Sequence, residues 1–326
     1  MNYKNLFKNF FFFCICVLIL GWGMQWFFDG LIDFSEWKIS RQKKDIFLGN
    51  ISGNAASVQQ KVFEESQLPL RNWQIEDLKI DSESAISVET DLKNPDKILF
   101  KKDEQKKLTI ASLAKLMTAI VSLENYDLSE EIAISEETTM KTDEQGPLIA
   151  VKNMSVENLL YLMLIESSNH ASYSLSEAME DGKFVDLMNK KAMAIGLKNT
   201  YFIDSTGLDK ENYSTAEDLI ILTKYFLNNY PVIAEISRTK EFDLYNEDNS
   251  LYKKLINTNK LLLDVDIPEA VAGKTGFTED AKECLLLAVK NSKKGSYLIN
   301  VILGSNDRFL EMKKMIEWVE TAYKWQ

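Results

Sequence analysis

The sequence predicts a mixed domain of helices and strands, of class α+β or mixed α/β, whose two terminal regions share one sheet. Two strand-like runs, 85–88 and 98–100, flank the turn 93–96 and predict a hairpin. Two further apolar runs, 284–289 and 297–303, predict strands near the C-terminus. Helical periodicity fills the region between these pairs, so we expect strands from both ends to meet beside a mostly helical subdomain.

Composition and charge exclude several classes of protein. The 326 residues include 38 Lys+Arg and 49 Asp+Glu, a net charge of −11, which argues against a nucleic-acid binder. With 45% hydrophobic and 27% charged residues, the chain is neither disordered nor a polytopic membrane protein. A Ser-His-Asp hydrolase would have to use the single histidine, His170, and a His-Glu-x-x-His zinc site is impossible. The three cysteines form neither a disulfide framework nor a CxxC pair.

The N-terminal segment 10–28 predicts a membrane helix. Gln25 is its only strongly polar side chain, and its length approaches the roughly 20 residues that span a bilayer. Lys4 and Lys8 precede it, so the positive charges favour a cytoplasmic segment 1–9 and an extracytoplasmic C-terminal body. We therefore expect a single-pass signal-anchor in the cell membrane.

A cleaved signal peptide is the alternative interpretation of the same segment. The Gly-Trp-Gly sequence at 21–23 is a poor cleavage site, and no lipobox precedes either N-terminal cysteine, so a retained anchor is favoured. Residues 29–78 have irregular apolar spacing, with small and turn-forming residues at 53–57. They predict a stalk, which leaves 79–326 as the folded domain.

Apolar residues recur at intervals of three and four in the middle of the chain. Three such stretches, 113–123, 159–164 and 219–226, predict helices. The chain closes with an amphipathic helix expected over about 309–323.

Ser112 and Lys115 form a Ser-x-x-Lys pair where the first of these helices begins. A separation of three places both side chains on one helical face, so Lys115 is placed to take the Ser112 proton. The same spacing occurs at four other sites in the chain, all in charged surroundings. The neighbourhood of Ser112 is small and apolar, so desolvation should lower the pKa of Lys115 toward neutrality.

Two later motifs carry further polar groups. Ser167 and Asn169 follow a helix expected over 156–166, where they either project into a cleft or, in the simpler interpretation, cap the helix end. The next motif consists of Lys274, Thr275 and Gly276, which come shortly before the strand at 284. Its glycine would leave a strand edge open for a peptide to pair along, although a surface strand end explains the same residues.

The order of the three motifs resembles that of the penicillin-binding transpeptidase and serine β-lactamase superfamily. Ser167 follows Ser112 by about 55 residues, and Lys274 follows Ser167 by about 107. Within this superfamily the chain looks most like the low-molecular-weight D-alanyl-D-alanine carboxypeptidases of peptidase family S11. The stretches that carry this closer resemblance are 111–118, 164–169, 196–202, 206–208, 213–216 and 272–276. The resemblance covers about 80–326 and implies a β-lactamase/transpeptidase-like fold, an antiparallel sheet of N- and C-terminal segments flanked by helices.

The resemblance also implies a function, a serine-type D-Ala-D-Ala carboxypeptidase that trims peptidoglycan stem peptides. Catalytic roles fall to Ser112 as nucleophile, Lys115 as general base and Ser167 as proton relay. The implied contacts with substrate and oxyanion come from Asn169, Lys274, Thr275 and Gly276, and from the backbone N–H groups of Ser112 and Phe277. No metal or other cofactor is needed, and β-lactam antibiotics are expected as covalent inhibitors.

The chain departs from the family pattern at four places. Ser168 replaces the usual glycine of the second motif, and His170 follows it where aspartate is usual; we expect His170 to have no catalytic role. Phe277 stands where histidine is frequent. Thr258 stands where some relatives carry a basic residue, which puts one substrate-carboxylate contact in doubt. The β-rich C-terminal domain and anchor of many relatives are missing, so the N-terminal segment is expected to tether the protein.

Three alternatives stay open at this point. A β-lactamase shares all three motifs, but the absence of a Glu-x-x-Leu-Asn segment between the second and third motifs argues against a class A enzyme. A DD-endopeptidase uses the same catalytic groups. A non-catalytic, membrane-tethered peptidoglycan-binding protein would retain the pocket without the chemistry.

Overall fold

The computed structural model describes residues 69–134, 153–180, 182–246, 250–264, 267–291 and 295–325. Residues Pro69–Gln326 form one compact unit. The predicted cytoplasmic residues 1–9, the membrane segment 10–28 and the stalk up to residue 68 lie outside the described residues. Within the described ranges, no helix has the length and apolarity needed to cross a bilayer.

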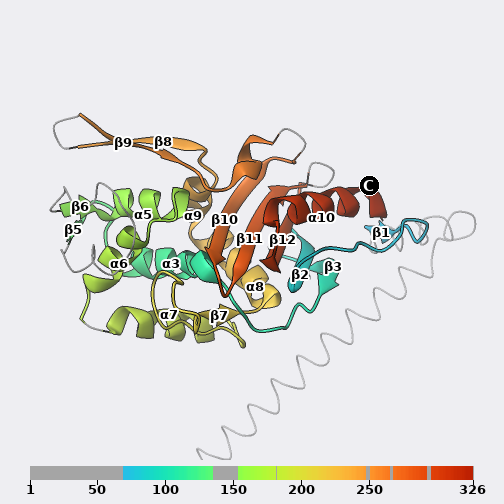
Figure 1. Ribbon diagram of the computed structural model, residues 1–326, viewed down its shortest axis with the longest axis horizontal. Helices are drawn as coiled ribbons and strands as arrows, with labels where there is room; N and C mark the ends of the chain where they lie inside the picture. The colour runs from blue at the N-terminus through green and yellow to red at the C-terminus, as the bar shows by residue number, and fades with distance from the viewer. Residues whose placement is uncertain are drawn as a thin grey trace, which may run out of the picture. The chain divides into compact units, whose positions relative to one another are not determined.

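A five-stranded antiparallel sheet organises this unit (Figure 1). Its strands, in spatial order, are β10 (Ala270–Thr278), β11 (Lys282–Lys290), β12 (Tyr297–Ser305), β2 (Ser84–Thr90) and β3 (Lys97–Lys102). The N-terminal hairpin β2–β3 therefore joins the C-terminal strands, with Val88 opposite Ile299. The predicted hairpin, the C-terminal strands and their shared sheet are confirmed.

The sheet buries both of its faces. Successive residues of β11 alternate in direction, because side chains of a strand point to opposite sides. Leu285 and Leu287 pack with Met312 and other residues of α10 (Arg308–Ala322), whereas Leu286 packs with the helices on the other face. The long apolar run of this strand follows from that double burial.

The helical subdomain lies between the two groups of strands in sequence. Its helices are α3 (Lys115–Asn125), α5 (Val156–Ile165), α6 (Asn169–Glu177), α7 (Lys183–Ala194), α8 (Ala216–Asn229) and α9 (Pro231–Ser237). Side chains at the N-caps fix several starts: Ser155 accepts from the Asn158 N–H, and Thr215 accepts from the Asp218 N–H. The three helices predicted from periodicity, and the closing helix α10, are confirmed.

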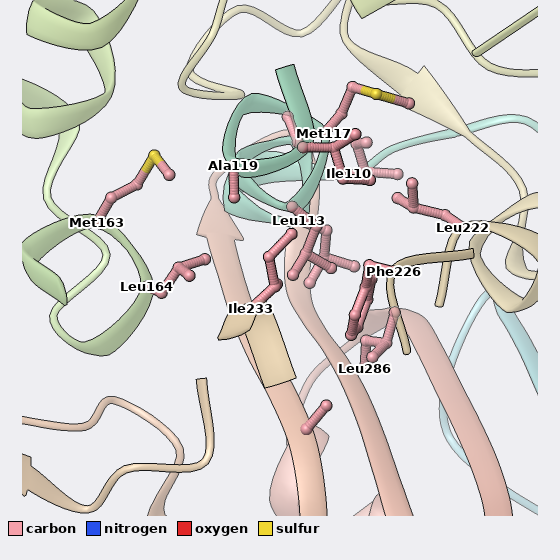
Figure 2. Packing of buried hydrophobic residues seen from close by; sticks show 14 of the residues in the cluster. Ile110, Leu113, Met117, Ala119, Met163, Leu164, Leu222, Phe226, Ile233 and Leu286 are labelled. Carbon is pink, nitrogen blue, oxygen red and sulfur yellow. The ribbon is translucent and has the colours of Figure 1, made fainter. Parts of the chain in front are cut away.

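Helix α3 passes through the middle of the core. Figure 2 shows Leu113 and Met117 surrounded by residues of several other elements, among them Phe226 of α8, Ile233 of α9 and Leu286 of β11. Every residue from Lys115 to Ser122 is buried. Replacing Leu113 by alanine should cost about 2–5 kcal/mol of folding free energy, because the cavity would be enclosed on all sides.

Four pairs of short strands and one further 3₁₀ turn also occur in the described part of the chain. They are β4 (Leu108–Thr109) with β7 (Tyr213–Ser214), β5 (Glu131–Ala133) with β6 (Asn153–Ser155), the hairpin of β8 (Glu241–Tyr245) and β9 (Leu251–Ile256), the pair β1 (Leu70–Arg71) with β13 (Tyr323–Lys324), and the 3₁₀ turn η3 (Lys260–Leu263).

The pairing of β1 with β13 moves the start of the folded unit from the predicted residue 79 to residue 69. The Arg71 guanidinium lies 4.7 Å from the centre of the Trp318 ring, and the Trp318 indole donates to the Glu76 carbonyl at 2.8 Å. Residues 69–78, assigned from the sequence to the stalk, are thus fastened to the C-terminal helix. Apolar spacing gave no sign of this, because the contacts are backbone pairing and cation–π stacking with a partner some 240 residues away.

Candidate active site

Ser112 lies in a 3₁₀ turn, η1 (Ala111–Ala114), which leads directly into α3. Two glycines let other segments approach this turn closely. A Cβ atom on Gly207 would lie 1.9 Å from the Ala111 carbonyl oxygen, and one on Gly276 would lie 3.2 Å from the Ser112 nitrogen. Ala111 itself has a φ of +46°, a strained value for a residue with a side chain. The turn is therefore fixed from both sides by tightly packed backbone.

Lys115, the first residue of α3, is fully buried beside Ser112. Its Nζ lies 2.9 Å from Ser112 Oγ, 2.7 Å from Asn169 Oδ1 and 2.8 Å from the Thr206 carbonyl oxygen. The amide and carbonyl oxygens only accept hydrogen bonds, so they take up both N–H groups of a neutral amine. The remaining lone pair then faces the Ser112 hydroxyl, which is the geometry that proton abstraction requires.

Lys274 occupies the opposite side of the site on β10 and is also buried. Its Nζ donates to Ser167 Oγ at 2.7 Å and to the Thr275 carbonyl oxygen at 3.0 Å. Burial, followed by the neighbouring Lys115 and Arg308 side chains, holds the pKa of Lys274 well below its usual value. The Ser167 hydroxyl is thus held by an amine that is readily neutral.

The second motif lies in the connection between α5 and α6. Ser167 has a φ of +65°, which turns the chain sharply between the two helices. Ser168 is the N-cap of α6 and accepts from the Ala171 N–H at 3.2 Å. A capping role, the simpler interpretation, therefore holds for Ser168, whereas Asn169 lies against Lys115 and Ser167 against Lys274.

The third motif lies on an outermost strand of the described sheet, as the predicted open edge requires. The Thr275 hydroxyl pairs with the Thr258 hydroxyl at 2.6 Å, and the Thr258 N–H donates to the Ile165 carbonyl at 3.1 Å. Thr258 therefore links the second and third motifs. Phe277, the residue after Gly276, is 61% exposed, and Gly276 itself packs against Ser112.

The three motifs, whose first and last residues, Ser112 and Gly276, are 164 positions apart, meet in one site. Ser112 and Asn169 contact Lys115, and Ser167 contacts Lys274. Thr275 and Gly276 adjoin Lys274 on the same strand, and Gly276 packs against Ser112. Within the part of the chain that the structure describes, no group of three or more side chains is arranged to bind a metal ion.

The sequence profile of the D-alanyl-D-alanine carboxypeptidase family (peptidase S11) matches residues 71–307, which is most of the chain and includes all three motifs. The chain belongs to this family. The predicted family resemblance is confirmed, and with it the class of the enzyme, a serine peptidase.

Curated relatives within the family include both carboxypeptidases and endopeptidases. The D-alanyl-D-alanine carboxypeptidase DacF of Bacillus subtilis is 32% identical over 260 residues, which cover 76% of this chain and 64% of that protein. A D-alanyl-D-alanine endopeptidase of Escherichia coli is 31% identical over 236 residues, 70% of this chain and 75% of its own length. The chain thus spans just under two thirds of the length of the Bacillus relative.

Solved structures confirm the transpeptidase-like fold. Penicillin-binding protein D2 of Listeria monocytogenes, solved in an ampicillin-bound form, aligns with a TM-score of 0.64 at 25% identity, covering 74% of this chain and 98% of that one. The Streptomyces K15 DD-transpeptidase aligns with a TM-score of 0.66 at 23% identity, covering 76% of this chain and all of its own. An antiparallel sheet flanked by helices is common to the family and to this S11 chain.

The loop 204–212 holds one side of the S11 site. The sequence marked 206–208 as a family-like stretch but gave the loop no role. Asp204 Oδ1 accepts from the N–H groups of Thr206 and Gly207 and from the Thr206 hydroxyl, at 2.6 to 2.7 Å. Asp204 Oδ2 accepts from the Asp209 N–H and from the Asn212 side chain, both at 2.9 Å. Burial by itself would raise the pKa of Asp204, but these donors hold the pKa below its usual value. The loop thereby presents the Thr206 carbonyl to Lys115.

His170, the single histidine, lies buried in α6, directly after Asn169. The absence of a catalytic role for His170 stays a prediction. Thr258 and Arg308 are the other residues at the site that motif analysis gave no role, although a departure from the family pattern did draw attention to Thr258.

Proposed function

We propose that this protein is a serine-type D-Ala-D-Ala carboxypeptidase that removes the terminal D-alanine from peptidoglycan stem peptides. One observation carries the proposal: Lys115 Nζ lies 2.9 Å from Ser112 Oγ and also donates to two oxygens that can only accept, Asn169 Oδ1 and the Thr206 carbonyl. A buried amine arranged in this way is a general base for the serine.

Catalysis begins when Lys115 takes the Ser112 proton as Oγ attacks the carbonyl carbon between the two D-alanines. The C–N bond then breaks, and the proton that Lys115 took reaches the departing D-alanine amine through the Ser167 hydroxyl, which gains one proton as it gives up another. Lys274 supports this relay through its 2.7 Å hydrogen bond to Ser167 Oγ. Neutral Lys115 then takes a proton from the water that attacks the acyl-enzyme ester, and returns it to Ser112 Oγ as the shortened peptide leaves.

In this mechanism the developing oxyanion lies between two backbone segments, one from the turn η1 and one from β10. Because Gly276 packs directly against Ser112, the N–H groups of Ser112 and Phe277 come from adjacent segments. Two such donors would stabilise the tetrahedral intermediate, and one donor is typically worth about 10²–10³ in rate.

Asn169 and the third motif hold the substrate. Asn169 orients the substrate amide while its Oδ1 accepts from Lys115. The peptide pairs along the edge of β10, where Lys274 and Thr275 bind the terminal carboxylate. A bound carboxylate favours the protonated form of Lys274, so substrate binding should be accompanied by proton uptake at pH values above the lowered pKa of Lys274.

β-Lactam antibiotics react with Ser112 in the same way, because their strained amide mimics the scissile bond and the ring prevents the leaving group from departing. The ampicillin-bound form of the Listeria protein D2 supports this part of the proposal.

We further propose that the segment 10–28 anchors the protein in the cell membrane, with this chemistry at the outer surface. Its apolar length and the flanking Lys4 and Lys8 support a single-pass anchor with the catalytic domain on the extracytoplasmic side. Peptidoglycan lies in that compartment, so the proposed location of the catalytic domain matches that of its proposed substrate.

A DD-endopeptidase is the second candidate, and Thr258 favours it. A threonine hydroxyl, already paired with Thr275, offers no full positive charge to a free terminal carboxylate. A site of this kind tolerates a peptide that continues past the scissile bond, as in a cross-link. The Escherichia coli relative named an endopeptidase is consistent with that specificity.

Intact-mass measurement of the full-length protein incubated with penicillin tests the proposal, beside a Ser112→Ala variant. We expect a stable adduct of one penicillin on the wild type alone. Release of D-alanine from a pentapeptide, compared with cleavage of a cross-linked dimer, then separates carboxypeptidase from endopeptidase. A folded wild type that neither forms an adduct nor hydrolyses the drug would be a non-catalytic binding protein, and rapid hydrolysis would make it a β-lactamase.

A further inference from the structure

Arg308, the first residue of α10, points at the backbone of the third motif. Its Nη1 donates to the Gly276 carbonyl oxygen at 2.7 Å, and its side chain is only 14% exposed. The Glu283 carboxylate accepts from the Arg308 backbone N–H at 2.9 Å and lies 3.9 Å from its Nε. The guanidinium carbon also lies 5.0 Å from the centre of the Phe309 ring. The cation is therefore held in one place by a carboxylate, a ring and a carbonyl.

The carbonyl that Arg308 contacts belongs to the same peptide group as the Phe277 N–H. In a planar trans peptide the C=O and N–H bonds point in opposite directions. Arg308 approaches from the side of β11, the strand that carries Glu283. The Phe277 N–H is consequently directed away from Arg308, toward the outer edge of the described sheet. Ser112 packs against Gly276, the residue that precedes Phe277.

A cation on a carbonyl oxygen strengthens the N–H donor of that peptide group. It draws electron density from nitrogen to oxygen through amide resonance, so the hydrogen becomes more positive, and it fixes the plane of the group. A water molecule at that carbonyl would polarise the peptide group less and would fix its plane less firmly, because water is neutral and mobile.

We propose that Arg308 is a positioning residue for acyl transfer: it orients and polarises the Gly276–Phe277 peptide group so that the Phe277 N–H stabilises the oxyanion. The inference rests on the proposed function, because it assigns Arg308 to the oxyanion site of that reaction. Arg308 itself touches no reacting atom.

Acylation by penicillin, resolved into a binding constant and a first-order acylation rate constant, measures the effect. In full-length Arg308→Ala we expect the acylation rate constant to fall about tenfold, because the Phe277 N–H would stabilise the oxyanion less strongly. The binding constant should change less than twofold. Guanidinium ions added to this variant should restore part of the rate, because the cavity left beside Gly276 accepts them.

The infrared carbonyl band of the acyl-enzyme, formed with carbon-13-labelled penicillin, reports the oxyanion hydrogen bonds directly. A weaker Phe277 donor should move this band to higher wavenumber in Arg308→Ala, a shift that general loss of stability would not produce. Arg238→Ala is the matched control: its guanidinium is exposed and lies 3.9 Å from Glu269, just before β10 begins. The acylation rate constant and the carbonyl band of Arg238→Ala should both match those of the wild type.

Arg308→Gln removes the charge with a smaller change of shape and serves if the alanine variant does not fold. An unchanged acylation rate constant together with an unchanged carbonyl band in either folded variant would overturn the role of Arg308. Wild-type protein that forms no adduct would instead contradict the proposed function, and the role of Arg308 would fall with it.

Discussion

The two lysines of the site are both buried but are held in different ways. Lys115 stands at the start of a core helix and contacts oxygens from three separate segments, those of Ser112, Asn169 and Thr206. Lys274 stands on an outer strand and donates to one hydroxyl and to the carbonyl of the next residue. A neutral Lys115 therefore has its lone pair directed at the nucleophile, whereas a neutral Lys274 can still accept a proton when a carboxylate arrives. Burial alone does not define a catalytic base; the direction of the remaining lone pair does.

The largest effect should come from Lys115→Met, which keeps the volume of the side chain and removes the base. We expect acylation by penicillin to slow by about 10²–10⁴, because no other group described here contacts Ser112 Oγ as a base. Stopped-flow or intact-mass kinetics measures the rate. The exposed Lys198→Met should behave as the wild type. A wild-type acylation rate in folded Lys115→Met would show that Lys115 is not the general base for Ser112.

Lys274→Met should slow acylation by about 10² but stabilise the fold at neutral pH. The folded-state pKa of Lys274 is lowered, so the unfolded chain binds more protons between that pKa and the ordinary lysine value near 10.4. The wild type consequently gains stability as pH rises through this interval. Thermal unfolding from pH 6 to 10 should show the Tm advantage of the variant shrinking; an advantage that grows with pH would contradict the assignment.

Asp204→Ala tests whether the loop behind Lys115 must be rigid. Several donors would lose their acceptor, so we expect a loss of about 3 kcal/mol in the free energy of unfolding and slower acylation. The pKa of Asp204 is lowered in the fold, so its contribution is complete above the unfolded value near 3.9 and is lost as pH falls through the folded value.

Urea unfolding at pH 7 and at pH 3 measures this difference between wild type and variant. Asp209→Ala is the control in the same loop, since the Asp209 side chain accepts one hydrogen bond, from the exposed Glu211 N–H. An equal loss at both pH values would show that the Asp204 charge is irrelevant.

Thr258→Val removes the hydroxyl that pairs with Thr275 while its backbone bond to Ile165 remains. We expect a cost of about 1 kcal/mol in stability and a raised KM for peptides with a free D-alanine carboxylate. Calorimetry and D-alanine release measure the two effects. An unchanged KM for peptides with a free D-alanine carboxylate would show that the Thr258 hydroxyl does not contribute to substrate binding.

The smallest effect should follow Phe277→Ala. The Phe277 side chain is 61% exposed and only its backbone N–H has a proposed role, so acylation should stay within about twofold of the wild type. Gly276→Ala, one residue earlier, should be severe, because a Cβ there would lie 2.9 Å from the Ile110 carbonyl oxygen. A large loss of acylation in Phe277→Ala would show that the side chain itself acts.

Several features of this protein were determined by local sequence. Three such features each depend on neighbours within a few residues: the spacing of Ser112 and Lys115, the short strand-like runs of β2 and β3, and the three- and four-residue spacing in α3, α5 and α8. The order of the three motifs indicated the superfamily and its chemistry, and the stretches around and between the motifs indicated the family. These signals are readable because they reside in side chains at fixed separations.

The tertiary structure decided which distant groups complete the site. The Thr206 carbonyl that holds Lys115, the strand β13 that secures residues 69–78, and the Gly276 carbonyl that receives Arg308 all act through the backbone. Every residue carries a carbonyl, so nothing in the sequence distinguishes the one that is used. Which carbonyl meets which side chain depends on how segments far apart in the chain pack, and only the folded domain determines that.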